Sequence, residues 1–414
     1  MVSRRSFVLG TPGLLVGALA GCSGSAGDPA GGGAPGGTAS PGGTTPRPGP
    51  PATPTSGSIP QPAPASPPSG SAPSGSPAPT SPEPAEPAEP FTVRPRAPEV
   101  VADDLDVPWG IAFLPDGSAL VGERGTGRLL RVTPRGAVRT LGTVRGVVAP
   151  TGLGEGGLLG IALAPGDPET LFIHHTSGSD DRVVRLSLAG GRVGRPRPVL
   201  TGIPTSTHHH GGQLLFDPDG MLLVSTGDAE QSSLAQDRGS LAGKILRIRP
   251  DGRAAPGNPF GNRTWSYGHR NVEGLAFDEA GRLWATEFGD KRADELNLVR
   301  RGRNYGWPQV EGRSSRRGLT SPRATWSPTS SCSPAGLAIT RSTALVGALQ
   351  GQCLFAVPLD GTSAGKPRGY FTGDHGRLRS VAVAPDGLLW VTTSNTDGRV
   401  RPGRDDDKIL RVTL

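Results

Sequence analysis

After residue 92 the chain repeats one pattern of apolar and polar residues six times. Each copy has a Gly or another small residue, a short alternating apolar run, a Pro-Asp-Gly-like turn and a second alternating run. The first copy reads PWGIAFLPDGSALVGER, and the copies begin at Pro108, Gly157, Gly211, Val272, Ser333 and Leu378. Alternation with a period of two on both sides of an Asp-Gly turn is typical of a β-hairpin. The pattern therefore predicts six hairpins in an all-β domain.

The spacing of the copies predicts the architecture. They begin about 45 to 60 residues apart, which is the span of a four-stranded propeller blade. Further strand-like runs lie between them, at 128–132, 182–186, 244–248 and 353–357. We expect a six-bladed β-propeller over residues 93–414, with four-stranded antiparallel blades and the first strand of each copy innermost. A final strand at 408–414 should pair with an early strand and close the ring, which leaves no open edge. A β-sandwich fits this spacing poorly.

The first 92 residues have a different character. Residues 1–22 read as a signal peptide, with a twin-arginine pattern at Arg4 and Arg5 and a lipobox-like LAGC that ends at Cys22. Residues 23–92 are almost wholly Gly, Pro, Ser, Thr and Ala, a composition that predicts a disordered linker. We therefore expect export, acylation of Cys22 and a lipid anchor on the outer face of the cell membrane. An ordinary secretory signal with a chance Cys is the alternative.

Composition narrows the classes of partner. The net charge is +7, and most basic residues are Arg. A basic chain suggests nucleic acid, a membrane surface or an anionic ligand. No Lys/Arg run with interleaved aromatic residues is present, so we expect no nucleic acid and favour an anionic small molecule held by arginines. No apolar run after the N-terminus approaches 18 residues, which excludes a polytopic membrane protein. Cys332 and Cys353 form either a disulfide or two buried thiols.

Three histidines, His208, His209 and His210, directly precede the third predicted inner strand. Adjacent residues of an extended chain point in alternate directions, so the three cannot easily bind one metal ion, and a single general base is the better interpretation. Asp228 ends the same hairpin and can reach back to a histidine near its start. A carboxylate that orients an imidazole is the usual partner of a general base. A turn Asp beside solvated histidines is the alternative.

Three other polar clusters lie at comparable positions. Arg270 and Asn271 precede the fourth inner strand and suit a planar ligand with carboxylates and carbonyls. Arg377 and Arg379 share one face near the sixth, where either an anionic ligand or an ion-pair network would neutralise them. The stretch Glu287–Glu295 combines a glycine turn with carboxylates, which suits an oxygen-preferring ion such as Ca²⁺. Because inner strands converge on a central channel, we expect these clusters to meet in space.

A longer run of motifs extends from Ser266 to Pro308, with SYGHRNVEGLAF, ATEFGD and DELNLVRRGRNYGWP. Further motifs are VPWGIAFLPDG, GEGGLLGIAL, HHGGQLLFDPDG and GRLRSVAVAPDG, in order over most of the chain from about Val93 to Leu414. Together they resemble the soluble sugar dehydrogenases that depend on pyrroloquinoline quinone (PQQ), the glucose/sorbosone and aldose dehydrogenase group. That family is a six-bladed propeller with PQQ across its central mouth.

The resemblance implies roles for these residues. His209 matches the base that takes the proton of the sugar's C1 hydroxyl, and Asp228 matches the carboxylate that holds it. The residues that match cofactor contacts are Glu155, Arg270, Asn271, Arg377 and Arg379, with Arg270 also placed to stabilise charge on the reduced quinone. The residues that match calcium positions are Gly289 and Asp290, through backbone carbonyls, and Glu295 and Tyr305, near a second, structural ion. The implied reaction oxidises an aldose to its lactone by hydride transfer to PQQ, and the electrons pass to an external quinone or redox protein.

Three departures from the family bear on specificity. Glucose-oxidising members have a lysine that helps to bind PQQ, and this chain has Gln350 at that position. Those members also have an acidic residue directly before the base, where this chain has His208. Insertions that shape the glucose pocket and the dimer surface are absent. We therefore expect a broad aldose range and a monomer.

Two alternative functions remain. One is an extracellular propeller that binds a ligand without PQQ activity, which the catalytic and arginine residues above argue against. The other is a Ca²⁺-dependent lactonase, which would need acidic and Asn side chains around one axial ion.

Overall fold

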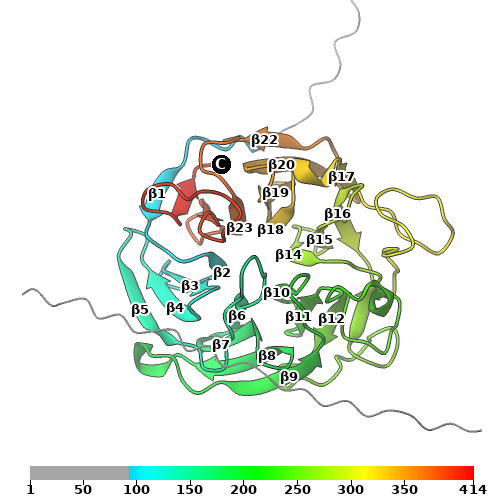
Figure 1. The fold of residues 1–414 in the computed structure, drawn as a ribbon, viewed down its shortest axis with the longest axis horizontal. Helices are drawn as coiled ribbons and strands as arrows, with labels where there is room; N and C mark the ends of the chain where they lie inside the picture. The colour runs from blue at the N-terminus through cyan, green and yellow to red at the C-terminus, as the bar shows by residue number, and fades with distance from the viewer. Residues whose placement is uncertain (1–92) are drawn as a thin grey trace, which may run out of the picture. The chain divides into compact units, whose positions relative to one another are not determined.

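The computed structural model describes residues 93–414; Cys22, the expected signal peptide and the expected linker lie outside the described residues. The described residues form six antiparallel sheets arranged as a ring around a central axis (Figure 1). The predicted six-bladed propeller is therefore confirmed.

The first strand of each sequence copy is the innermost strand of its blade. From the axis outwards, blade one has β2 (Pro108–Phe113), β3 (Ala119–Glu123), β4 (Arg128–Val132) and β5 (Val138–Thr143), and blade two has β6 (Leu158–Ala164), β7 (Asp167–Thr176), β8 (Asp181–Ser187) and β9 (Arg197–Ile203). Blade three has β10 (Gly211–Phe216), β11 (Leu222–Thr226), β12 (Lys244–Ile248) and β13 (Thr264–Tyr267), and blade four has β14 (Val272–Phe277), β15 (Leu283–Glu287), β16 (Asp294–Val299) and β17 (Ala324–Trp326). Blade five has β18 (Pro334–Thr340), β19 (Thr343–Ala348) and β20 (Cys353–Asp360), with β21 (Ser363–Ala364) and β22 (Arg368–Tyr370) both paired to β20. Blade six has β23 (Leu378–Val383), β24 (Leu389–Thr393), β25 (Ile409–Val412) and β1 (Glu99–Ala102).

The ring closes through strands from distant parts of the sequence. β25 pairs with β24 on one side, where Leu410 is opposite Val391, and with β1 on the other, where Leu410 is opposite Val100. In Figure 1 the cyan β1 accordingly lies beside the red end of the chain. The predicted closing strand is confirmed, and blade six takes its outermost strand from the beginning of the domain.

The hydrophobic core is divided among the gaps between neighbouring blades. The cluster between blades one and two includes Leu120, Leu158 and Leu171, and the one between blades six and one includes Val121 and Trp390. Comparable clusters fill the other four gaps. Full burial of a side chain of this size stabilises the fold by about 1.5–3 kcal/mol, so each blade is held mainly by its two neighbours.

Glycines on the inner strands allow close packing around the axis. A Cβ atom on Gly160 would lie 2.3 Å from the carbonyl oxygen of Gly212, and one on Gly336 would lie 2.7 Å from the Cα of Ser380. Neighbouring inner strands therefore approach backbone to backbone at these points, and any larger residue would push the blades apart.

The helices of the described residues are three short 3₁₀ turns: η1 (Ala189–Gly191), η2 (Ser232–Ala235) and η3 (Thr329–Ser331). In this part of the chain no helix has the length and apolar character that crossing a bilayer requires.

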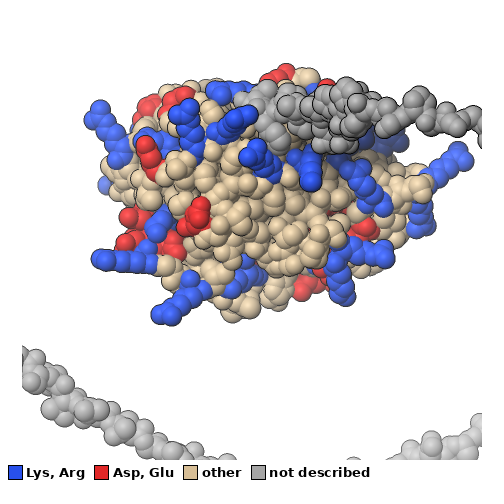
Figure 2. Space-filling view, turned by 90° about the horizontal axis from the view of Figure 1, so that it is seen from above, with Lys and Arg blue, Asp and Glu red and all other residues tan. Residues whose placement is uncertain are grey.

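Lys and Arg side chains project over much of the surface visible in Figure 2, with acidic groups among them.

The two cysteines of the described residues lie in the core between blades four and five. Cys332 and Cys353 are both buried and both free. Of the two possibilities left open by the sequence, the structure therefore contains the buried thiols. Burial raises the pKa of the Cys353 thiol to about 11, so it is protonated and unreactive at neutral pH.

Candidate active site

The polar clusters predicted from the sequence meet at one mouth of the central channel, at the ends where the inner strands begin. They surround a cavity of about 200 Å³. The predicted residues that line it are Glu155, His209, Arg270, Gly289, Asp290, Arg377 and Arg379, and Gln350 lines it as well. Blades two to six all contribute side chains or backbone, so the cavity exists only when the ring is assembled.

The two largest hollows lie elsewhere and have a different chemistry. One of about 470 Å³ is lined mainly by apolar residues of the C-terminal halves of the inner strands, such as Ile161 and Leu214. Another, of about 440 Å³, lies between blades three and four and is lined by Trp265, Phe277 and Arg247 among others. Neither of these two contains a histidine. The smaller cavity is therefore the better candidate for an active site.

Asp228 holds His209 at the wall of this cavity. Asp228 Oδ1 lies 2.7 Å from His209 Nδ1. Asp228 is itself fixed, because its Oδ2 accepts a hydrogen bond from the Trp307 indole at 2.7 Å and its Oδ1 accepts one from the Glu230 amide at 2.9 Å. The other ring nitrogen of His209, Nε2, has no hydrogen bond to a described residue and is free to meet a substrate.

The backbone around His209 is unusual. His209 has a φ of +63°, in the left-handed region that few non-glycine residues adopt. Its amide donates to Glu155 Oε2 at 3.0 Å, and its carbonyl accepts from the Ala229 amide at 3.3 Å. A Cβ atom on Gly227 would lie 1.8 Å from that carbonyl oxygen, so Gly227 can only be glycine. The end of the β10–β11 hairpin thus fixes the backbone of His209, and the contact with Asp228 orients its imidazole.

The three adjacent histidines pair with three different carboxylates. His208 Nδ1 lies 3.1 Å from Glu230 Oε1 at the rim, whereas His210 Nδ1 lies 2.8 Å from Asp181 Oδ2 in the interior. Burial alone would lower the pKa of His210, but the hydrogen bond to Asp181 and its charge outweigh burial and raise it. The three imidazoles therefore point to three separate acidic partners, as alternation along an extended chain predicts.

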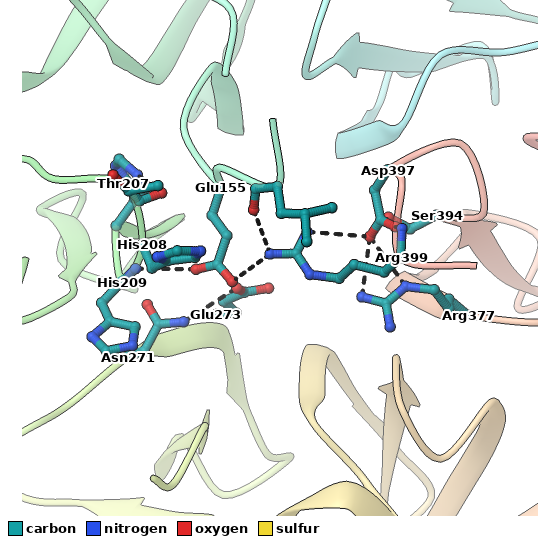
Figure 3. Close-up of polar contacts among 12 residues, drawn as sticks. Glu155, Thr207, His208, His209, Asn271, Glu273, Arg377, Ser394, Asp397 and Arg399 are labelled. Atoms are coloured by element: carbon teal, nitrogen blue, oxygen red, sulfur yellow. Dashed lines mark hydrogen bonds and ion pairs between the residues drawn. The ribbon is translucent and has the colours of Figure 1, made fainter. Parts of the chain in front are cut away.

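Four arginines line the cavity, and each has a carboxylate partner. The pairs are Arg270 with Asp290 at 3.3 Å, Arg377 with Asp397 at 3.0 Å, Arg379 with Glu273 at 2.8 Å and Arg399 with Glu155 at 3.1 Å. Figure 3 shows Arg399 between Glu155 and Asp397, with Arg377 on the far side of Asp397. Burial alone would raise the pKa of Glu155, but the amide of His209 and the charge of Arg399 hold it below its ordinary value. The arginines thus both line the cavity and belong to an ion-pair network.

Asn271 lies directly behind the cavity. Its Oδ1 accepts a hydrogen bond from the Gly211 amide at 2.8 Å, and its Nδ2 donates to Glu273 Oε1 at 3.3 Å. Asn271 is fully buried. It therefore ties blade three to blade four beside His209, and both halves of its amide already have protein partners.

The loop at Gly289 and Asp290 is shaped by a carboxylate that the sequence did not point to. Glu311 Oε1 accepts hydrogen bonds from four successive amides, Asp290 to Ala293, at 2.7 to 3.1 Å. Successive amides that point inward to one anion turn the carbonyl groups of the same segment away from it. A Cβ atom on Gly289 would lie 2.1 Å from the carbonyl oxygen of Ala293, so this tight turn requires glycine.

A metal ion at this loop would need backbone oxygens. Within residues 93–414 no group of three or more His, Cys, Asp or Glu side chains is arranged to hold an ion. Asp294, next to the loop, accepts hydrogen bonds from the amides of Gly289 and Ser333 at 2.9 and 2.7 Å. Burial nevertheless raises the pKa of Asp294 to about 7. Carbonyl and carboxylate oxygens of this kind are the donors that Ca²⁺ accepts.

Glu295 and Tyr305 lie outside the lining of the cavity. Glu295 is buried and accepts hydrogen bonds from the Gly312 amide and the Asn297 side chain, and burial together with the charge of Glu287 raises its pKa above the ordinary value. The Tyr305 hydroxyl donates to the carbonyl of Leu298 at 2.6 Å. Both side chains are engaged by protein groups, and the structure does not bring them together with the predicted cavity residues.

Arg399, Asp397 and Glu273 were not identified from the sequence. Arg399 and Asp397 come from the irregular segment between β24 and β25, where no periodicity indicates which side chains face the channel. Glu273 is the second residue of inner strand β14, and its position two residues after Asn271 was a usable signal. Trp307 lies in the NYGWP motif, but only the fold shows that its indole reaches Asp228.

Comparison with known proteins identifies related chains. The family model described as Glucose / Sorbosone dehydrogenase matches residues 105–402. The PQQ-bound form of aldose sugar dehydrogenase from Streptomyces coelicolor is 45% identical, with a TM-score of 0.73, over 76% of this chain and 96% of that one. Aldose sugar dehydrogenase YliI of Escherichia coli is 30% identical over 73% of this chain and 91% of its own. Quinoprotein glucose dehydrogenase B of Acinetobacter calcoaceticus is 30% identical over 52% of each chain.

Proposed function

This chain belongs to the glucose/sorbosone dehydrogenase family, and from that membership we propose that it is a PQQ-dependent aldose dehydrogenase. The proposed reaction oxidises the C1 hydroxyl of an aldose to the lactone and passes two electrons to an external quinone or redox protein. The observation that carries the proposal is the 2.7 Å contact between His209 and Asp228 at the wall of an arginine-lined cavity. Relatives over most of this chain that are named as sugar dehydrogenases support it.

The cavity residues fit an anionic, planar cofactor. PQQ carries three carboxylates, and Arg377, Arg379 and Arg399 converge on the cavity. Nε of Arg270 and Nη1 of Arg399 are buried and have no hydrogen-bond partner among the described residues, so donors remain for a ligand. When bound, PQQ would supply the two-electron acceptor, and the carbonyls of Gly289 and Asp290 would hold a Ca²⁺ that would supply a Lewis acid.

His209 is proposed to act as the general base. Its Nε2 takes the proton of the C1 hydroxyl as the hydride leaves C1, which balances the two-electron oxidation. Asp228 keeps the Nδ1 proton in place and stabilises the imidazolium that forms, because its negative charge lies 2.7 Å away. Trp307 and the Glu230 amide keep Asp228 from rotating. A positioned base of this kind typically contributes about 10²–10⁴-fold to the rate.

Arg270 is proposed to stabilise negative charge that develops in the cavity. Its guanidinium lies 5.4 Å from the centre of the Trp307 ring and pairs with Asp290 at 3.3 Å. These contacts fix a positive charge close to the base and to the loop at Gly289. Preorganised charge of this kind stabilises a transition state without further rearrangement.

Substrate range and setting are part of the same proposal. Gln350 at the cavity and His208 at its rim support a broad aldose range, since neither supplies the charge of the glucose-oxidising pattern. The sequence signals before residue 23 support export, a lipid anchor at Cys22 and a site of action outside the cytoplasm. We propose a monomer, because the insertions that form the dimer surface in relatives are absent.

The test is reconstitution. Purified protein is loaded with PQQ and Ca²⁺ and assayed with a redox dye against a panel of aldoses, and dye reduction with formation of lactone is expected. Exhaustive chelation should abolish turnover, and Ca²⁺ should restore it much better than Mg²⁺, whose octahedral demands suit this loop poorly. PQQ binding without oxidation of any aldose, or lactone hydrolysis that does not need PQQ, would contradict the proposed function.

A further inference from the structure

Arg124 lies in blade one, immediately after β3. Its amide donates to the carbonyl of Val107 and its carbonyl accepts from the amide of Leu158, both within 3.1 Å, so its backbone joins blade one to blade two. Only 3% of the residue is exposed. A Cβ atom on Gly157 would lie 3.0 Å from Arg124 Cγ and 2.2 Å from its carbonyl oxygen. Gly157 thus makes room for an arginine that solvent does not reach.

The guanidinium of Arg124 is not satisfied by the protein. Its Nε and Nη1 atoms are buried and have no hydrogen-bond partner among the described residues. Burial lowers the pKa of Arg124 to about 10, which still leaves it charged at neutral pH. A buried charge without a partner is strongly destabilising, and folded proteins retain such groups mainly where a function requires them.

The other arginines around the channel differ from Arg124. Arg377, Arg379 and Arg399 pair with Asp397, Glu273 and Glu155. Arg124 borders this network, because its carbonyl accepts a hydrogen bond from the amide of Leu158, three residues after the Glu155 that lines the cavity and pairs with Arg399. The charges of Arg379 and Arg399 add to burial in lowering the pKa of Arg124. Within the described network, four guanidiniums therefore face three carboxylates. The surplus positive charge belongs to Arg124, since each carboxylate already has an arginine partner.

We propose that Arg124 is a ligand-binding residue, whose unmatched positive charge is neutralised when a carboxylate-bearing ligand occupies the cavity. This inference rests on the proposed function, since the ligand it names is PQQ. It adds a residue that neither the sequence motifs nor the lining of the cavity identifies. It also explains why the chain has a buried guanidinium without a hydrogen-bond partner, although this charge destabilises the ligand-free protein.

The proposal makes stability and binding change in opposite directions. Arg124→Met keeps much of the side-chain volume and removes the uncompensated charge, so the ligand-free protein should become more stable while PQQ binds less tightly. Arg128 offers a matched contrast, because it lies four residues further on and forms an ion pair with the buried Glu123. Arg128→Met should lower stability and leave PQQ binding unchanged.

The experiment measures two quantities for wild type, Arg124→Met, Arg124→Lys and Arg128→Met. The first is the Tm of the ligand-free protein, and the second is the Kd of PQQ in the presence of Ca²⁺, from the quenching of tryptophan fluorescence. We expect Arg124→Met to raise Tm and to raise Kd by about tenfold or more. Arg124→Lys, which retains the charge, should keep Kd within about threefold of wild type.

The outcomes separate the two proposals. An Arg124→Met protein with a lower Tm and an unchanged Kd would show a structural arginine and overturn this inference, whereas the proposed function would stand. A wild-type protein that binds no PQQ would overturn both. A raised Tm together with a raised Kd in Arg124→Met, and neither effect in Arg128→Met, would support the inference.

Discussion

Asp228 Oδ1 lies 2.7 Å from Nδ1 of His209, although 19 residues separate the two in the sequence. The contact follows from the register of the hairpin. Gly211 is opposite Thr226 in the β10–β11 pair, so the residues just before β10 and just after β11 lie side by side. A base and its carboxylate are thus brought together by the same turn-and-strand pattern that builds every blade.

Replacement of the base should remove the chemistry and leave binding intact. His209→Ala is expected to lower kcat by about 10²–10⁴-fold, because the C1 hydroxyl then loses its proton acceptor. The Kd of PQQ should stay close to that of wild type. His208→Ala is the control, since His208 pairs with Glu230 at the rim and should retain much of the rate. Equal losses in the two variants would contradict the assignment of the base to His209.

His210 should make stability depend on pH. Because its pKa in the folded state is raised above the ordinary 6.5, its extra stabilisation is fully present below pH 6.5 and is lost as the pH rises through the raised value. Tm measured from below pH 6.5 to about pH 9 should therefore fall more steeply in wild type than in His210→Gln. Parallel curves would show that the His210–Asp181 pair makes no pH-dependent contribution.

The arginines of the cavity should be tested as pairs. Arg377→Ala alone leaves Asp397 buried without its main partner, which costs about 3–5 kcal/mol of stability. A weaker binding of PQQ to that variant could then come from partial unfolding rather than from the lost contact. Arg377→Gln combined with Asp397→Asn removes both charges and should keep Tm near that of wild type. The loss of one charge-assisted hydrogen bond, about 1.5–3 kcal/mol, should raise the Kd of PQQ by about 10- to 100-fold. An unchanged Kd in the double variant would argue against an anion site at Arg377.

Gln350→Lys should restore a missing positive charge. Gln350 lines the cavity but is exposed, so the gain is modest, at about threefold to fivefold in the Kd of PQQ, and it should shrink at high salt. Gln309→Lys, an exposed position outside the lining of the cavity, controls for the added charge. Equal tightening in both variants would mean that the effect is one of net charge alone.

Glu311 should control the loop that carries Gly289 and Asp290. Glu311→Ala leaves four amides without their acceptor, and hydrogen exchange of residues 290–293 should become faster. The Ca²⁺ concentration that restores half of the activity after chelation should rise by about tenfold. Glu311→Gln keeps one carbonyl oxygen and should show a smaller change in both measurements. Unchanged exchange in Glu311→Ala would show that the loop holds its shape without this carboxylate.

Much of the fold and part of the site could be predicted from the sequence, because both follow the same repeat. The period-two pattern and its spacing specify strands and blades, and the polar residues that precede each inner strand necessarily converge at one mouth. For this reason the repeat alone is enough to predict that His209, Arg270 and Arg377 lie around one cavity.

Other parts of the site depend on contacts that no local pattern encodes. Arg399 and Glu311 come from irregular segments, where neither period nor turn chemistry indicates a direction. Arg124 follows a strand end with the sequence Glu-Arg, which on its own suggests a solvated surface pair. Its burial follows from the contact of blade one with the Gly157–Leu158 segment of blade two.

The closure of the ring has a consequence for biosynthesis. Glu99 and Arg411 are opposite each other in the β1–β25 pair. The first strand of the propeller can therefore pair only after the last strand has been synthesised. A nascent chain can form its first five blades while it is still being translated, but blade six stays incomplete until Val412 has left the ribosome. Until then β1 has no partner, and the unpaired edge is open to wrong associations. A polypeptide truncated before β25 therefore lacks the strand pairing that closes the ring, and it cannot complete blade six.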